Sequence, residues 1–167
     1  MIDLPKTKYC HLDINDDWLT ISLDNDKKKN ALSATLIDEI IKVLKNAGQS
    51  TQIRGILIKG KNRIFCSGAD LEELHQITYA KENREELTTR MSIRIGNLLQ
   101  TISNVPQITA SVVDGPCIAG GFGIACATDI MITMDSSIFK LSETQLGLTP
   151  AQIAPYILNR VNYSQAR

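Results

Sequence analysis

The sequence predicts a layered α/β domain, on three observations. Short apolar runs typical of buried strands alternate with longer amphipathic stretches typical of helices. Most of these runs end at glycine, proline, asparagine or aspartate, which favour turns. Strands that alternate with helices along a chain favour right-handed crossovers and a sheet covered by helices. With 167 residues, the chain is long enough for one domain with a hydrophobic core.

The charges of the chain balance, with 18 Lys and Arg against 18 Asp and Glu. A formal net charge of zero provides no basic surface for nucleic acid or for an anionic membrane. The N-terminal residues lack the apolar core of a signal peptide, and no apolar run is long enough to cross a bilayer. We therefore expect a soluble cytoplasmic protein whose partners include neither nucleic acid nor membrane.

The four cysteines are expected to be packing residues. Cys10, Cys66, Cys117 and Cys126 lie among apolar or small residues, and none forms a CxxC pair. The two histidines add no metal-ligand spacing, and neither is placed in the sequence to activate a thiol. The prediction is reduced, mostly buried thiols and no metal site.

The elements follow in order from the apolar pattern. Alternating polar and apolar residues predict strands at 9–14 and 18–23, joined as a hairpin at the edge of the sheet. Ser33 is a good N-cap for a helix from 34 to about 47, which Gly48 ends. The remaining runs predict strands at 53–59, 64–66, 108–113, 130–133 and 138–140, and helices from 71, up to about 103, from about 120, and over 153–161.

Two charged segments each allow two interpretations. Residues 24–30 form a polar loop with three consecutive lysines, Lys27 to Lys29, which is either simply solvated or a flexible clamp for phosphate. Residues 81–90 are either a mobile loop or the exposed start of the helix that ends near residue 103.

Two corners of the chain share one design, in which a strand leads through small residues into a helix start. The first corner is Phe65 to Asp70, and the second is Ile118 to Gly121. The first N–H groups of a helix have no intrahelical acceptor and favour negative charge. If the corners face each other, the N–H groups of Ala69 and Gly120 converge on one oxygen as an oxyanion hole. The alternative is that each corner is a structural turn.

Glu143 follows the predicted strand 138–140 in a weakly charged run. A carboxylate at this place is either a surface residue or a general base at the end of the sheet.

Four segments, in this order, resemble the enoyl-CoA hydratase/isomerase (crotonase) superfamily. They are Asn30-Ala31-Leu32, FCSGADL at 65–71, DGPCIAGGFG at 114–123 with Asp129-Ile130, and FKLSETQLGLTP at 139–150. The resemblance covers nearly the whole chain and implies a crotonase-like spiral of ββα turns that binds an acyl-CoA thioester. The implied activity is that of an acyl-CoA hydratase or isomerase in fatty acid metabolism, with no cofactor besides the coenzyme A of the substrate.

The resemblance also assigns roles to single residues. It implies that the N–H groups of Ala69 and Gly120 hold the thioester carbonyl, on which an enolate forms. Glu143 matches one of the two catalytic glutamates of the hydratases. The loop near residues 28–32 and the backbone at 66–68 are expected to hold coenzyme A, with Lys27 to Lys29 as candidate phosphate contacts. The expected binding residues are Lys28, Asn30, Ala31, Leu32, Cys66, Ser67, Gly68, Asp70, Gly121 and Gly123.

The sequence departs from this family in three places. Gly123 stands where hydratases carry their other glutamate, so Glu143 alone would add water or shuttle a proton as an isomerase does. The missing side chain is also expected to hollow the pocket, with room for a branched or carboxylated acyl group. Residues 151–157 replace the family's usual glycine-rich segment, and the run LSExxxGLxPA resembles a branch that includes methylglutaconyl-CoA hydratase-like proteins.

The third departure is the end of the chain at residue 167, where the family continues into C-terminal helices. We expect the helical trimerisation region to be missing. Two hypotheses of function stay open: an active acyl-CoA enzyme, as a homotrimer or hexamer, or a catalytically inactive CoA-binding or assembly fragment. A dinucleotide-binding domain is disfavoured, because residues 119–123 do not fit the GxGxxG fingerprint.

Overall fold

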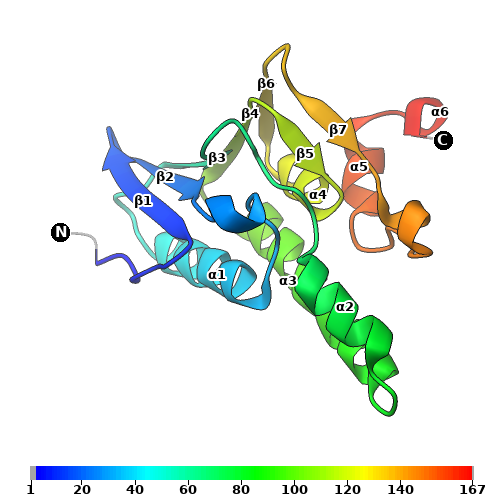
Figure 1. Cartoon of the computed structure of the whole chain (residues 1–167). Helices are drawn as coiled ribbons and strands as arrows, with labels where there is room; N and C mark the ends of the chain where they lie inside the picture. The colour runs from blue at the N-terminus through cyan, green and yellow to red at the C-terminus, as the bar shows by residue number, and fades with distance from the viewer. Residues whose placement is uncertain (1–2, 167) are drawn as a thin grey trace.

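The computed structural model describes residues 3–166 and contains two sheets with helices packed around them (Figure 1). The larger sheet has the strand order β1-β2-β3-β4-β6, and the smaller one pairs β5 with β7. The strands are β1 Cys10–Asn15, β2 Trp18–Leu23, β3 Gly55–Gly60, β4 Ile108–Val113, β5 Pro116–Ile118, β6 Ile130–Thr133 and β7 Ile138–Lys140. The helices are η1 Asp26–Lys28, α1 Ala34–Gly48, α2 Leu71–Tyr79, α3 Arg84–Asn104, α4 Gly120–Ala127, η2 Glu143–Leu146, α5 Ala154–Arg160 and α6 Tyr163–Ala166.

The strands of the larger sheet are parallel except at one edge. There β1 and β2 form an antiparallel hairpin in which Asn15 lies opposite Trp18. The pairs β2–β3, β3–β4 and β4–β6 are parallel, and each requires a crossover connection. These crossovers contain α1, then α2 and α3, then α4. The predicted edge hairpin and the α/β layering are confirmed.

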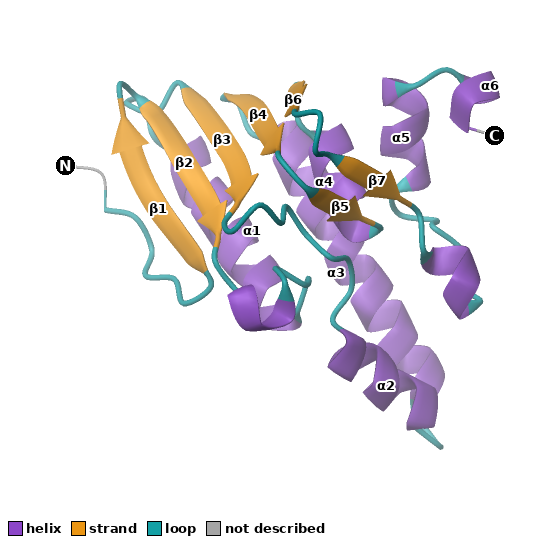
Figure 2. Cartoon of the chain, turned by 45° about the horizontal axis from the view of Figure 1, so that its top comes forward, coloured by secondary structure: helices purple, strands orange, loops and turns teal. Residues whose placement is uncertain are grey.

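Helices α1, α3 and α4 lie on one face of the larger sheet (Figure 2). Helix α1 begins after Ser33, whose Oγ accepts the Leu36 N–H at 3.3 Å, as expected for an N-cap. Helix α3 begins at Arg84, so the charged segment 81–90 includes an exposed helix start. The core combines fully buried side chains of the sheet and of these helices: Leu19, Ile21, Ile56, Ile58, Leu36, Ile40, Leu44, Leu98 and Leu99. Within residues 3–166, no helix has both the length and the apolar character needed to cross a bilayer.

Two short segments differ from the sequence prediction. Residues 64–66 form no strand and make only an isolated parallel bridge, in which Cys66 lies opposite Cys117. The reason is that the Phe65 and Cys66 N–H groups both donate to the Pro116 carbonyl, at 3.0 and 3.1 Å, instead of alternating along a ladder. Conversely, residues 116–118, for which the sequence pattern predicted no strand, form β5 because they pair with the distant strand β7.

The backbone is packed without room for side chains where the larger sheet meets the first corner. A Cβ on Gly60, at the end of β3, would lie 1.9 Å from the Ile64 carbonyl oxygen. A Cβ on Gly115, between β4 and β5, would lie 1.9 Å from the Arg63 carbonyl oxygen. The segment that leads into Cys66 is therefore held between β3 and the β4–β5 turn by contacts that only glycine permits.

Replacing Gly115 by alanine is expected to destabilise the fold by about 3 kcal/mol or more, because a backbone oxygen cannot rotate away as a side chain does. Gly48→Ala is the matched control, since its Cβ would meet only the Pro106 Cδ at 3.6 Å. Alanine is favoured over glycine within a helix by up to about 1 kcal/mol. Urea unfolding should therefore show a large loss for Gly115→Ala and none for Gly48→Ala, and equal midpoints for the two variants would contradict this packing.

Candidate functional site

The two corners lie side by side and are joined by the backbone β-bridge between Cys66 and Cys117, whose thiols are free. The Ile118 N–H donates to the Cys66 carbonyl at 2.9 Å, so the two segments run parallel from this point. A Cβ built on Gly68 would lie 3.1 Å from the Ala119 Cβ, which keeps the segments in contact two residues later. Ala69 and Gly120 each stand three residues beyond the bridged pair. They therefore occupy equivalent places in two adjacent turns.

An unusual backbone conformation precedes each of these two residues. Gly68 has φ +94°, and Ala119 has φ +51° with ψ −118°. Glycine adopts a positive φ without steric cost, but for alanine such a conformation costs about 1–3 kcal/mol. Strain of this kind persists where surrounding structure fixes it, and here the Ala119 N–H donates to the Lys140 carbonyl at 2.8 Å.

The N–H groups of Ala69 and Gly120 have no hydrogen-bond acceptor within residues 3–166. Gly120 is buried and is the first residue of α4, where an unpaired N–H and the positive end of the helix dipole coincide. Ala69 is half-buried, directly before Asp70 at the start of α2. Two free donors in adjacent turns can hold an oxygen that carries negative charge.

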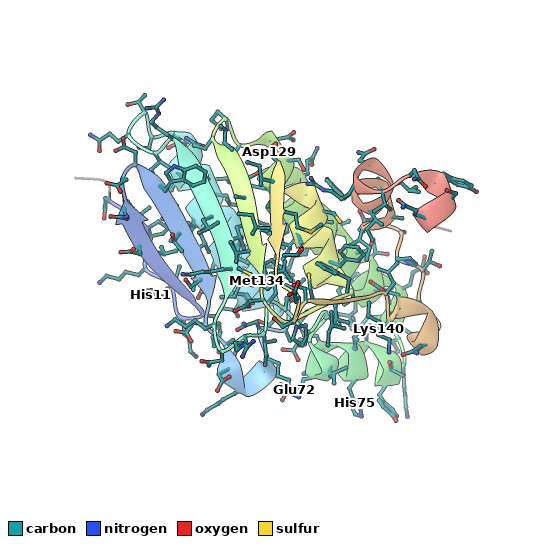
Figure 3. The ribbon with its side chains drawn as sticks, turned by 90° about the horizontal axis from the view of Figure 1, so that it is seen from above. His11, Glu72, His75, Asp129, Met134 and Lys140 are labelled. Carbon is teal, nitrogen blue, oxygen red and sulfur yellow. The ribbon has the colours of Figure 1, made fainter. Side chains whose placement is uncertain are left out.

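The pairing of β5 with β7 relates the segment that contains Glu143 to the second corner. These strands are parallel, with Ile118 opposite Lys140, so the chain leaves one strand toward Gly120 and the other toward Glu143. Lys140, at the end of β7, lies toward the end of the molecule that carries Glu72 and away from Asp129 (Figure 3). The sequence pattern placed Glu143 after the strand 138–140, and the structure adds that this strand pairs with β5.

Glu143 is half-buried, and its Oε2 is enclosed without a hydrogen-bond partner within residues 3–166. Loss of water around this carboxyl group raises its pKa above the ordinary value, although backbone hydrogen bonds at Glu143 and Ser142 oppose the shift. A carboxyl group with these properties holds a proton more readily than a surface glutamate does. Such a group can accept a proton and return it.

The expected coenzyme A residues other than Gly121 and Gly123, which belong to α4, lie in two segments that run along each other. The Leu32 N–H donates to the Gly68 carbonyl at 2.7 Å, and the Ser67 N–H donates to the Lys29 carbonyl at 3.1 Å. Several of the side chains are occupied or enclosed. Lys28 is ion-paired with Asp70 and Glu72, and Leu32, Ala31 and Cys66 are buried.

Asn30 has a structural contact role in the described chain. Its amide group accepts from the Asn25 N–H at 2.8 Å and donates to the Ile64 carbonyl at 2.7 Å. It is buried and has φ +55°, a conformation that asparagine tolerates better than most residues. Asn30 thereby connects the loop after β2 to the segment that leads into the first corner.

The expected hollow beside Gly123 is not present, and this prediction is wrong. A Cβ on Gly123 would lie 2.5 Å from the Ile153 Cγ2, 3.1 Å from its Cβ and 3.4 Å from the Leu99 Cδ1. Ile153 belongs to the segment that departs from the family's glycine-rich pattern, and it fills the volume that a side chain at residue 123 would take. Gly121 is similarly constrained, since its Cβ would lie 2.6 Å from the Cys66 Cβ.

The cysteines are buried free thiols, as predicted. Burial is the main cause that raises the pKa of Cys66 to about 12 and that of Cys126 to about 11. A thiol with so high a pKa is protonated at neutral pH and is a poor nucleophile. Cys66 and Cys117 therefore serve the packing of the two corners.

A groove that the sequence did not reveal lies between α3 and the start of α5, with a volume of about 570 Å³. Its lining residues are Ile93, Gly96, Asn97, Gln100, Ala151, Gln152, Pro155, Tyr156 and Asn159. Gln152 crosses this region, where its Nε2 donates to the Ser92 Oγ at 3.0 Å. The absence of a side chain on Gly96 makes room for Gln152, a contact that single-sequence patterns do not show.

The sequence and the fold of this chain are similar to those of known proteins. Residues 13–167 match the sequence profile of the enoyl-CoA hydratase/isomerase family. The chain is 32% identical over 148 residues to the enoyl-CoA hydratase AFT6-1 of Alternaria alternata, covering 88% of this chain and 46% of that protein. It is 32% identical over 146 residues to the bacillaene synthase dehydratase PksH of Bacillus subtilis, covering 87% and 54%.

Solved structures show the same fold. The Pseudomonas aeruginosa protein AtuE has a TM-score of 0.89 and 31% identity, with 96% of this chain and 61% of that one covered. An enoyl-CoA hydratase from Shewanella pealeana has a TM-score of 0.90 and 28% identity, with 97% and 60% covered. The chain thus spans about half the length of the two curated relatives and about three fifths of these structures.

The contact between Gly123 and Ile153 can be tested by a double-mutant cycle. Gly123→Ala is expected to destabilise the fold by about 1–3 kcal/mol through overpacking, and Ile153→Ala by about 2–4 kcal/mol through lost burial. The double variant should be at least about 1 kcal/mol more stable than the sum predicts, because removal of the Ile153 Cγ2 makes room for the new Cβ. Unfolding costs that add within about 0.5 kcal/mol would show that the two side chains do not compete for this space.

Proposed function

Because the chain belongs to the enoyl-CoA hydratase/isomerase family, we propose that it binds an acyl-CoA thioester and stabilises the enolate of that thioester. The carbonyl oxygen accepts hydrogen bonds from the Ala69 and Gly120 N–H groups, and Glu143 transfers the proton. The observation that supports this most directly is the equivalent placement of two unpaired N–H donors, each three residues beyond the backbone β-bridge of Cys66 and Cys117. The strand that precedes Glu143, β7, pairs with the strand that precedes Gly120, β5.

The proton transfer has a simple balance. The Glu143 carboxylate takes the proton from the carbon next to the thioester carbonyl, and the electrons of the broken C–H bond form the enolate. Negative charge then develops on the carbonyl oxygen, where each preorganised donor contributes about 3–4 kcal/mol to the transition state. Return of the proton to another carbon of the conjugated chain completes an isomerisation.

In hydration, the oxygen of water bonds to the next carbon while Glu143 takes one of the water's protons, and the electrons of the carbon–carbon double bond form the same enolate. The proton on Glu143 then goes to the carbon next to the thioester carbonyl, and dehydration is the reverse. The names of the two relatives, an enoyl-CoA hydratase and a dehydratase, support chemistry at these two carbons. With Gly123 packed against Ile153, Glu143 is the carboxylate to which we assign both the water and the proton. The presence of one assigned carboxylate favours reactions in which a single group carries out every proton transfer.

The coenzyme A portion is proposed to lie along the segments 29–32 and 66–68. The exposed side chains of Lys27 and Lys29 are the proposed phosphate contacts, because they carry positive charge beside these segments. The activity of the whole protein and its assembly as a trimer or hexamer belong to this proposal, since the chain spans about half of the relatives' length.

Glu143→Gln is expected to lower the exchange of the α-proton of butyryl-CoA with deuterated buffer by about 100-fold or more. Glutamine keeps the shape of the side chain but cannot hold the proton. Asp135→Asn is the matched control, an exposed carboxylate in the turn between β6 and β7, and its rate should equal that of the original chain. Exchange is followed by mass spectrometry of the acyl-CoA. Exchange in Glu143→Gln at the original rate would contradict the role of Glu143, and no exchange in the unchanged chain would contradict the function itself.

The raised pKa of Glu143 also predicts how rate and stability depend on pH. The exchange rate should fall as pH decreases, with a midpoint above the ordinary glutamate value of 4.5, because protonation removes the base. The folded state favours the protonated form, so it loses stability as pH rises from 4.5 through the raised pKa. Glu143→Gln should therefore be more stable than the original chain at neutral pH and equal to it below pH 4.5. A stability difference independent of pH would contradict the burial of this carboxyl group.

A further inference from the structure

We propose that the ion pair between Lys28 and Asp70 positions the Ala69 N–H, so that Lys28 acts through Asp70 and not on the substrate's phosphates. The inference rests on the proposed function, since it concerns the donor assigned there to the thioester carbonyl. It departs from the expectation that Lys28 contacts coenzyme A.

Lys28 and Asp70 form a close ion pair in which only the aspartate is buried. The Lys28 Nζ lies 2.7 Å from the Asp70 Oδ2, with the lysine side chain 36% exposed and the aspartate side chain 4% exposed. A buried carboxylate is costly unless it is paired and hydrogen-bonded. Lys28 supplies that charge from a segment 42 residues away in the sequence.

Asp70 is held from a second direction as well. Its Oδ1 accepts the Glu72 N–H at 3.0 Å, which makes Asp70 the N-cap of α2. The two carboxylate oxygens are thus fixed by different partners, one on α2 and one at the end of η1. Because Asp70 directly follows Ala69, this fixes the backbone on one side of the Ala69 peptide.

The same two segments are joined on the other side of Ala69. The Ser67 Oγ donates to the Lys28 carbonyl at 3.2 Å, and the Leu32 N–H donates to the Gly68 carbonyl at 2.7 Å. Beyond Asp70, the Glu73 Oε1 accepts the Ala34 N–H at 2.7 Å. These contacts flank Ala69 in both directions while its own N–H has no acceptor within residues 3–166. The donor is therefore free, but its position is fixed.

Local charge also argues against a phosphate at Lys28. Its Nζ lies 2.6 Å from the Glu72 Oε2 as well, so one positive charge faces two negative ones. The group as a whole is negative, and a phosphate placed on Lys28 would meet both carboxylates. Hydrogen bonds to Asp70 and then to Glu72 are the main causes that raise the pKa of Lys28, so it stays charged at neutral pH.

The test measures affinity for three ligands that share the nucleotide but differ at the carbonyl: acetyl-CoA, S-ethyl-CoA and free CoA. S-ethyl-CoA is a thioether and has no carbonyl oxygen to accept the Ala69 N–H. Lys28→Met and Asp70→Asn should each lose about tenfold in affinity for acetyl-CoA, while the other two ligands change less than about twofold. Asparagine remains a good N-cap, so Asp70→Asn keeps α2 in place. Glu72→Gln should have a smaller effect, because that side chain is 76% exposed.

Lys61→Met is the matched control, because Lys61 forms an ion pair of 2.6 Å with Asp24, separate from the pair of Lys28 and Asp70. It should leave all three affinities unchanged. The stretching frequency of the bound thioester carbonyl, followed by infrared spectroscopy, should shift toward that of the free ligand in Lys28→Met, but not in Lys61→Met. This spectroscopic readout responds to the donor itself and not to general stability.

Three results would overturn the inference. Equal losses for all three ligands would make Lys28 a phosphate contact. Unchanged affinities and an unchanged carbonyl frequency in both Lys28→Met and Asp70→Asn would reduce the ion pair to a structural role. If the chain without any substitution binds acetyl-CoA no better than S-ethyl-CoA, the proposed binding of the carbonyl is wrong, and this inference is wrong with it. That outcome is distinguishable from the other two, because it needs no variant.

Discussion

The parallel bridge between Cys66 and Cys117 is the interaction on which the candidate site depends. Through the Ile118 N–H and the Cys66 carbonyl, it brings a loop after β3 against the short strand after β4. The residues that follow Cys66 and those that follow Cys117 are therefore in register, and the two segments turn at equivalent positions. Helices α2 and α4 then begin after these turns, with a free N–H on Ala69, just before the N-cap of α2, and another on Gly120, the first residue of α4.

Several features of the site oppose the stability of the fold. Ala119 has a positive φ, two backbone N–H groups lack acceptors within residues 3–166, and the Glu143 carboxyl group is enclosed without a partner. Features of this kind persist only where the surroundings over-determine them. Here the surroundings are fully buried side chains such as Phe65 and Ile124, together with the pairing of β5 and β7. Burial of the apolar core therefore offsets the free-energy cost of this strained backbone and these unpaired polar groups.

The glycines of α4 are explained by what packs on them as much as by the helix start. Gly120 lies under the Leu32 Cδ1, which would be 2.7 Å from an added Cβ. Gly121 and Gly123 meet Cys66 and Ile153 in the same manner. The first turn of α4 is thus covered by apolar atoms on several sides. A polar side chain at residue 123 would have to displace Ile153, and this connects the composition of one segment to that of another 30 residues later.

The sequence alone determined the elements with strong periodicity, the α/β layering and the identity of the residues at the two corners. It did so because helical spacing, strand alternation, the cap at Ser33 and short glycine turns are local properties of the chain. Only the tertiary structure decided that the backbone of Cys66 lies opposite that of Cys117 and that β5 forms. It also decided that Ile153 fills the space at Gly123 and that Lys28 forms an ion pair with Asp70. Each of these is a contact between segments far apart in the sequence, and no local pattern encodes which distant partner a buried residue meets.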